Sequence, residues 1–219
     1  LKSSLVAVSH IACKNVNLPI LNNIMIEAKD GNIKLISTDL EIGITAKVRG
    51  KVEKEGVFTV DSKVITDFVS LLPNQKVEIN LKDTDLVIES DNYKTKIKGQ
   101  SAEEYPLIPQ VDRNESYHLD PEEFRRALQQ VIFAGSKSEN RNEVNGVLFN
   151  FNNKELIMAA TDSYRLAEKK IKIKNKNTES KKVIVPAKTL QEVVRLLSNI
   201  KAEELGTEKK EMEFFVSEN

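Results

Sequence analysis

Cysteine, histidine and long apolar runs are scarce in this sequence of 219 residues. The single cysteine, Cys13, cannot form a disulfide within the chain, which is typical of a protein in the reducing cytoplasm. No apolar run approaches the roughly 20 residues that span a bilayer, and no charged segment followed by an apolar stretch opens the chain. Apolar residues make up 40% of the chain and charged residues 30%, so we expect a globular cytoplasmic protein.

Catalytic and metal-binding motifs are also lacking. His10 and Cys13 lie three positions apart in a helical pattern, but a metal site would need further ligands that the sequence does not offer. There is no Walker A loop, no G-x-G-x-x-G and no G-x-S-x-G motif. Acidic residues are scattered among lysines and do not form a paired general acid and base. The sequence therefore predicts a binding or scaffold protein without a metal or cofactor, not an enzyme.

The chain has no excess charge of either sign, since 33 basic residues balance 33 acidic ones. A protein that grips DNA tightly is usually strongly basic, so any contact with nucleic acid must depend on local placement of charge. A predicted helix over 120–135 carries Arg125 and Arg126 away from its apolar stripe, and Lys137 and Arg141 follow. Lys14 lies on the exposed side of a predicted helix over 1–14. These groups suit loose phosphate contact, and an ordinary solvated helix face is the alternative.

One pattern occurs twice along the chain. The stretches "LISTDLEIGITA" (35–46) and "LIMAATDSYRLA" (156–167) each place Thr-Asp between two runs that alternate like strands. The match extends upstream and downstream at nearly the same offset, pairing "LNNIMIEA" with "VNGVLFNF" and "VFTVDSKVITDFVSLL" with "KVIVPAKTLQEVVRLL". Each copy predicts helix, strands, helix and strands, so the fold class is α+β with a duplicated domain.

Helix starts and a linker define the two copies more closely. Asp61 and Asp120 are expected to be N-caps, and Pro186 fixes the backbone at the start of another helix. The stretch "YPLIPQVDRNES" (105–116) contains two prolines and a polar tail, which is typical of a linker. We therefore expect one domain over 1–110 and a second over 116–219.

The Thr-Asp pairs themselves, Thr38-Asp39 and Thr161-Asp162, favour a structural role. The side chains of Asp and Thr bond nearby backbone N–H groups and can hold a tight turn between strands. Duplication would then explain why the same corner occurs twice.

Several of these stretches resemble one known family. "NLPILNNIMIEAKDGNIKLISTDLEIGI" (17–44) is similar to the first domain of the bacterial DNA polymerase III beta subunit, the sliding clamp. "VNGVLF" and "AATDSYRLAE" resemble its second domain, "SAEEYPLIP" the junction after its first domain, and "VIVPAK" also fits. The resemblance covers nearly the whole chain. The matching stretches follow one another in the order that the family has, and they coincide with the two copies of the repeat.

The resemblance implies a DNA clamp fold, in which repeated domains carry helices on one face and antiparallel sheets on the other. Family members are non-catalytic head-to-tail homodimers with three domains per chain, and they encircle double-stranded DNA without reading its sequence. They tether DNA polymerase III as processivity factors. By this comparison the chain is expected to be a fragment, with domain 1 (1–110) lacking its first strand, domain 2 (116–219) stopping before its last strands, and domain three absent.

The resemblance also implies residue roles. A short motif of the Gln-x-x-Leu-Phe type, used by the polymerase alpha subunit, the clamp loader, mismatch-repair proteins and ligase, would bind a pocket that includes Val144, Thr161, Ser163, Tyr164, Arg165 and Leu166. The DNA-facing residues would be Lys14, Arg125, Arg126, Lys137 and Arg141. The dimer contact would involve Tyr105 and Leu107.

Alternatives remain for several of these roles. Leu166 could be a plain strand-core residue, and Tyr105 and Leu107 could simply pack the junction. The alternative function is a peptide-binding scaffold on the same duplicated fold, without a ring or any dependence on DNA. An enzyme is a third and more distant alternative.

Overall fold

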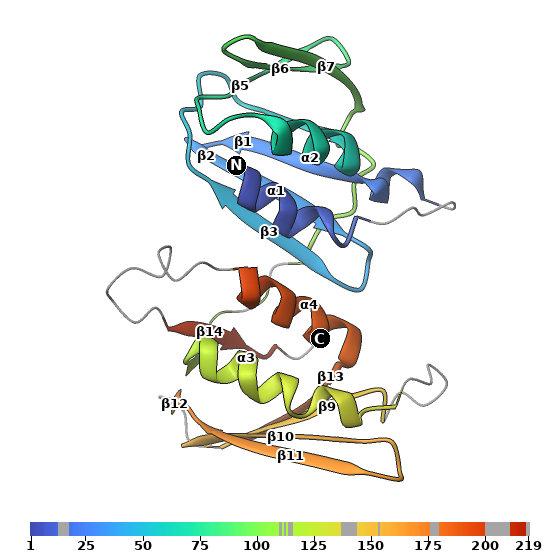
Figure 1. Ribbon diagram of the computed structural model, residues 1–219, viewed down its shortest axis with the longest axis vertical. Helices are drawn as coiled ribbons and strands as arrows, with labels where there is room; N and C mark the ends of the chain where they lie inside the picture. Colours follow the sequence, from blue (N-terminus) through green and yellow to red (C-terminus); the bar gives the residue numbers. More distant parts are fainter. Residues whose placement is uncertain are drawn as a thin grey trace. The chain divides into compact units, whose positions relative to one another are not determined.

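The computed structural model describes residues 1–12, 18–109, 111, 113, 116–136, 144–152, 154–175, 180–199 and 211–217. The chain divides into two compact units, Leu1–Pro109 and Gln110–Asn219. Each unit combines helices with antiparallel sheet (Figure 1). No helix in the described part of the chain is long and apolar enough to cross a membrane.

The first unit is built on one seven-stranded sheet with the strand order β3-β2-β1-β4-β7-β6-β5. All of its strand pairs are antiparallel. Its elements are α1 (Lys2–Ser9), the 3-10 turn η1 (Pro19–Asn22), β1 (Asn23–Lys29), β2 (Asn32–Thr38), β3 (Gly43–Val48), β4 (Gly56–Asp61), α2 (Ser62–Leu71), β5 (Glu78–Lys82), β6 (Asp85–Ser90) and β7 (Tyr93–Gln100).

Helices α1 and α2 lie side by side on one face of this sheet (Figure 1). Leu5 and Val8 of α1 and Ile65 of α2 are fully buried in a core shared with Ile24 and Val60 of the sheet. Helix α2 begins where predicted, because the carboxylate of Asp61 accepts the backbone N–H of Val64 at 2.8 Å. Helix α1 ends at Ser9, so the predicted helix over 1–14 is too long.

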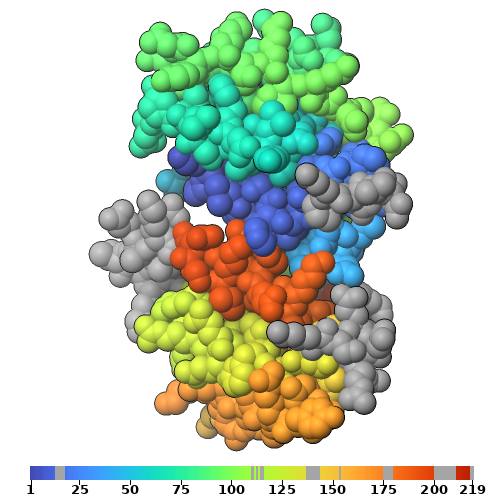
Figure 2. Space-filling view, turned by 45° about the vertical axis from the view of Figure 1, so that its right-hand side comes forward, coloured from blue at the N-terminus to red at the C-terminus, as the bar shows by residue number. Residues whose placement is uncertain are grey.

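The second unit contains two sheets, with strand orders β11-β10-β9-β13 and β12-β8-β14. Its elements are β8 (Ser116–Leu119), α3 (Pro121–Gln129), the 3-10 turn η2 (Ile132–Ala134), β9 (Gly146–Phe151), β10 (Glu155–Thr161), β11 (Leu166–Lys172), β12 (Lys174–Asn175), β13 (Lys181–Pro186), α4 (Ala187–Asn199) and β14 (Met212–Phe215). Helices α3 and α4 pack against each other, and Figure 2 shows their side chains adjacent on the surface of this unit.

Aromatic side chains fill the core of the second unit. Phe149 and Phe151 alternate inward along β9 and are fully buried. The ring of Phe151 stacks on Tyr117 with centroids 4.1 Å apart, and Phe149 meets Phe124 of α3 edge-on at 6.0 Å. Burying each such side chain contributes on the order of 2 kcal/mol. This cluster fixes α3 against the sheet.

Helix α3 begins as the sequence predicts and ends earlier. The carboxylate of Asp120 accepts the N–H groups of Glu122 and Glu123 at 3.0 and 2.9 Å, and Pro121 occupies the first turn. The predicted helix over 120–135 is interrupted, however, because α3 ends at Gln129 and the separate turn η2 follows.

Candidate functional site: a duplicated corner and a charged helix face

The first Thr-Asp corner joins β2 to β3. The Oδ1 atom of Asp39 accepts the backbone N–H groups of Glu41 at 3.1 Å and of Ile42 at 2.8 Å. The Oγ1 atom of Thr38 accepts the N–H of Leu40 at 3.0 Å. These bonds hold Leu40 at a φ of 78°, in the left-handed region that L residues rarely adopt.

The second corner, between β10 and β11, repeats this geometry. Asp162 Oδ1 accepts the N–H groups of Tyr164 and Arg165, both at 3.0 Å. Thr161 Oγ1 accepts the N–H of Ser163 at 3.1 Å, and Ser163 has a φ of 79°. The prediction that Thr and Asp side chains hold these turns is therefore confirmed in both copies. The backbone N–H of Tyr164, with further contributions from Arg165, lowers the pKa of the Asp162 carboxyl.

The two corners differ in what they display. Arg165 takes the place that Ile42 fills in the first corner, and Ile42 is only 9% exposed. The Nε of Arg165 donates to Asp162 Oδ2 at 2.9 Å, and the guanidinium lies 5.6 Å from the ring centroid of Phe133. One carboxylate thus shapes the turn and also orients a cationic side chain above an aromatic ring.

Large side chains around the second corner are uncovered. Tyr164 is 97% exposed, Leu166 is 71% exposed and Phe133 is 58% exposed. The alternative that Leu166 is a strand-core residue is wrong, because its side chain faces away from the core. Exposed apolar groups that gather at one place are typical of interaction surfaces.

Strand pairing brings the predicted pocket residues to one end of the sheet. Thr161 is the last residue of β10 and pairs with Leu166, the first residue of β11. Strand β9 begins at Gly146 and runs antiparallel to β10, so half-buried Val144 lies at the same end. The carbonyl of Val144 accepts the N–H of Ser136 at 2.8 Å, which ties this end to the segment after η2.

Phe133 is the residue at this site that the sequence analysis missed. It lies outside the apolar stripe of α3, in the 3-10 turn η2, and its contact with Arg165 joins residues far apart in the sequence. The sequence offered one sign of it, which is an aromatic residue that lies outside the apolar positions of the predicted helix.

The charged face of α3 is organised around one carboxylate. Glu122 accepts two bonds from Arg125, from Nε at 2.9 Å and from Nη2 at 2.7 Å, and one from the Nε of Arg126 at 2.9 Å. The guanidinium of Arg125, then that of Arg126, lowers the pKa of Glu122 from 4.5 to about 2. The other predicted DNA-facing residues, Lys14, Lys137 and Arg141, lie outside the described residues.

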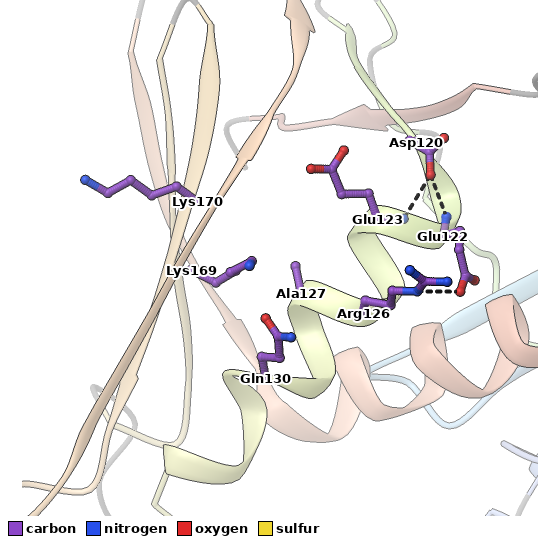
Figure 3. Close-up of a pocket in the computed structure, with 8 residues that line it drawn as sticks. All are labelled: Asp120, Glu122, Glu123, Arg126, Ala127, Gln130, Lys169 and Lys170. Atoms are coloured by element: carbon purple, nitrogen blue, oxygen red, sulfur yellow. Dashed lines mark hydrogen bonds and ion pairs between the residues drawn. The ribbon is translucent and has the colours of Figure 1, made fainter.

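An open cleft of about 390 Å³ borders this helix face, between α3 and β11 (Figure 3). Its charged lining residues balance in sign, which gives no preference for an anion or a cation. The lining residues are Asp120, Glu122, Glu123, Arg126, Ala127, Gln130, Lys169 and Lys170. Within the described ranges, no group of three or more His, Cys, Asp or Glu residues could hold a metal ion.

The predicted dimer residues differ in their exposure. Tyr105 is only 4% exposed, and its hydroxyl lies 3.2 Å from the carbonyl oxygen of Asn23 and 3.4 Å from that of Ile36. Burial raises the pKa of Tyr105 to about 12. Tyr105 therefore packs the segment 105–109 onto its own sheet, as the junction alternative expects. Leu107 is 93% exposed, so it is the one of the pair with a free surface.

Comparison with known proteins agrees with this architecture. The family model of the DNA polymerase III beta subunit N-terminal domain matches residues 1–109, and that of its central domain matches residues 118–216. The beta sliding clamp of Staphylococcus epidermidis is 31% identical over 191 residues, which is 83% of this chain and 50% of that protein.

Solved structures show the same fold. The DNA polymerase III beta subunit of Thermotoga maritima is 30% identical with a TM-score of 0.81, over 91% of this chain and 54% of its own. The DNA polymerase sliding clamp of Bacillus subtilis is 26% identical with a TM-score of 0.87, over 99% of this chain and 57% of its own.

The repeated α+β units, with helices on one face and antiparallel sheet on the other, therefore have the DNA clamp fold, as predicted. The chain belongs to the DNA polymerase III beta subunit family, and its units match the N-terminal and central domains of that family. It spans about half the length of the curated relatives it matches.

Proposed function

We propose that this chain serves in a sliding clamp, a processivity factor that encircles duplex DNA and tethers the replicative polymerase. It has no catalytic role of its own in this proposal. Family membership and the duplicated clamp fold support it, and they favour it over a scaffold that never meets DNA. We place its activity in the bacterial cytoplasm, at the nucleoid during replication, and expect the complete clamp to be a homodimer with a dimer contact that includes Leu107.

The zero net charge agrees with this role. Each phosphate that a protein neutralises steepens the dependence of log K on log salt by about 0.9, so many contacts make binding tight and salt-sensitive. A ring retained by its topology needs few such contacts, and tight ones would oppose sliding. Arg125 and Arg126 on α3 are the described residues that we assign to the DNA-facing surface.

The observation that carries the partner-binding proposal is the second corner. Asp162 holds Arg165 in place, and Tyr164 and Leu166 are left exposed beside it. We propose that Thr161, Ser163, Tyr164, Arg165, Leu166 and Val144 form one wall of a site for a Gln-x-x-Leu-Phe motif. The polymerase alpha subunit, clamp loader, mismatch-repair proteins and ligase are the partners we propose for it.

A peptide titration tests this assignment. A fluorescent Gln-x-x-Leu-Phe peptide is titrated against the chain and against Leu166→Asp, with Leu71→Asp as a matched control. Leu71 is also an exposed leucine, at 84%, but it lies at the end of α2 in the first unit. The S. epidermidis clamp serves as the positive control, which shows whether the peptide can bind a clamp at all.

We expect Leu166→Asp to remove peptide binding, since a buried charge would oppose the apolar motif residues. Leu71→Asp should bind as the parent chain does. Equal binding by both variants would contradict the assignment of the wall to residues 161–166.

A further inference from the structure

The arginines on the exposed face of α3 are not equally available to a ligand. The Nε and Nη2 of Arg125 form a two-pronged ion pair with both carboxylate oxygens of Glu122, and its Nη1 donates to Gln129 at 3.2 Å. Every nitrogen of this guanidinium is therefore engaged. The side chain of Arg125 is accordingly only 22% exposed.

Arg126 is held by a single bond. Its Nε donates to Glu122 Oε1 (Figure 3). The side chain of Arg126 is 70% exposed. Within the described part of the chain, the structure gives the two Nη groups of Arg126 no side-chain partner. Glu122 therefore occupies Arg125 with two bonds, whereas it holds Arg126 with one bond and leaves the two Nη groups of Arg126 without a described side-chain partner.

A carboxylate and a phosphate compete for the same donors. Both accept two parallel bonds from the planar fork of an arginine, so Arg125 cannot give a DNA phosphate the bonds that it gives Glu122. The side chain of Glu122 is 50% exposed, so solvent weakens these ion pairs and an approaching phosphate can displace the carboxylate at a cost. Such a competitor weakens a contact without abolishing it.

We propose that Glu122 is an internal competitor for DNA phosphates, which keeps the hold of α3 on duplex DNA weak. This inference depends on the proposed function, because it assumes that the arginine face of α3 meets DNA. It goes beyond that function by naming the acidic residue that limits the grip and so favours sliding.

The neighbouring Glu123 separates this role from an ordinary helix-end effect. Both glutamates lie in the first turn of α3, where acidic groups are favoured by the helix dipole. The structure gives the carboxylate of Glu123 no ion pair with any described residue. Glu122→Gln and Glu123→Gln therefore remove the same charge from the same turn, but only the first releases arginines.

The test is binding of the chain to a fluorescent duplex of about 20 base pairs, followed by anisotropy between about 50 and 200 mM salt. The chains compared are the parent, Glu122→Gln, Glu123→Gln, Arg125→Ala/Arg126→Ala, and the triple variant that adds Glu122→Gln to the two alanines. Circular dichroism confirms that each variant is folded.

We expect Glu122→Gln to bind more tightly than Glu123→Gln, and the gain to vanish in the triple variant. If one more phosphate is neutralised, the gain should be about threefold larger at 50 mM than at 200 mM salt. Equal binding by the two glutamine variants, or a gain that survives loss of the arginines, would overturn the inference.

The outcomes also distinguish the inference from the proposed function. In one outcome the double alanine variant loses DNA binding, while Glu122→Gln binds DNA as the parent chain does. This outcome would overturn the inference and leave the DNA-facing assignment of α3 in place. Failure of every chain to bind, Glu122→Gln included, would overturn the inference together with the DNA-facing assignment of α3.

Discussion

Asp39 and Asp162 make the same pair of hydrogen bonds in two copies of one corner. In each case Oδ1 accepts the backbone N–H groups two and three residues further on, at distances between 2.8 and 3.1 Å. In both copies the hydroxyl oxygen of the preceding threonine accepts the backbone N–H of the residue that follows the aspartate. Duplication of a domain explains the shared corner, whereas the ion pair between Asp162 and Arg165 belongs to the second copy.

Replacing these aspartates separates their role as acceptors of backbone N–H groups from the role of Asp162 in the ion pair with Arg165. Asp39→Ala and Asp162→Ala should each lower the free energy of unfolding by about 1 kcal/mol, the usual cost of losing a side-chain cap on backbone N–H groups. Asp162→Asn keeps an oxygen acceptor and removes the charge, so it should retain most of the stability. Urea unfolding and amide hydrogen exchange at Tyr164 and Arg165 measure these effects. Equal losses for Asp162→Asn and Asp162→Ala would contradict the capping role.

Replacing Ser163 by glycine should stabilise the protein. Its φ of 79° places it in a region that is unfavourable for residues with a Cβ. Ser163→Gly relieves this strain and is expected to raise the free energy of unfolding by up to about 1 kcal/mol, after the greater freedom of glycine in the unfolded chain is counted. Ser163→Val should be destabilising. Thermal unfolding measures both, and a loss of stability in Ser163→Gly would contradict the strained geometry.

Tyr105 should make the first unit sensitive to alkaline pH. Its pKa rises from 10.0 to about 12 because burial disfavours the charged phenolate. The resulting stabilisation is fully present below pH 10, where the unfolded chain is also protonated, and is lost as the pH rises through about 12. Tyr105→Phe should remove this part of the pH dependence. Urea midpoints measured between pH 9 and 12 test it, and identical profiles for the two chains would contradict the burial of the hydroxyl.

The carboxyl of Glu122 should titrate at about 2 instead of 4.5, because Arg125 and Arg126 bond to its ionised form. Since the folded pKa is the lower one, the ion pairs stabilise the fold above pH 4.5, and this contribution disappears as the pH falls through about 2. Carbon-detected NMR of the side-chain carboxyl measures the pKa directly. Arg125→Ala should raise it, whereas a value near 4.5 in the parent chain would show that the ion pairs do not persist in solution.

Much of the fold could be predicted from the sequence because its signals are local. The capping aspartates Asp61 and Asp120 mark helix starts, and the alternation around Thr38 and Thr161 marks strands on either side of a turn. The end of α3 could not be predicted in this way. The apolar stripe continues through Val131, which is fully buried although the α-helix has ended, so periodicity alone does not locate the break.

The turn of the candidate site was predictable from local residues, because Thr161 to Leu166 are contiguous. The pocket role of these residues and of Val144 came from the resemblance to the family and stays a prediction. The contact of Phe133 with Arg165 depends on how η2 packs beside the sheet, which no local pattern specifies. The ion pairs of Glu122 had a local signal, since Arg125 and Arg126 lie three and four residues further along the helix.

The most direct test of the account is an NMR titration of the isotope-labelled chain with a Gln-x-x-Leu-Phe peptide, because it detects weak binding and locates it. We expect chemical-shift changes at Thr161 to Leu166, Val144 and Phe133, and none at the equivalent first corner around Asp39. Changes confined to other parts of the chain, or equal changes at both corners, would contradict the claim that only the second corner binds partners.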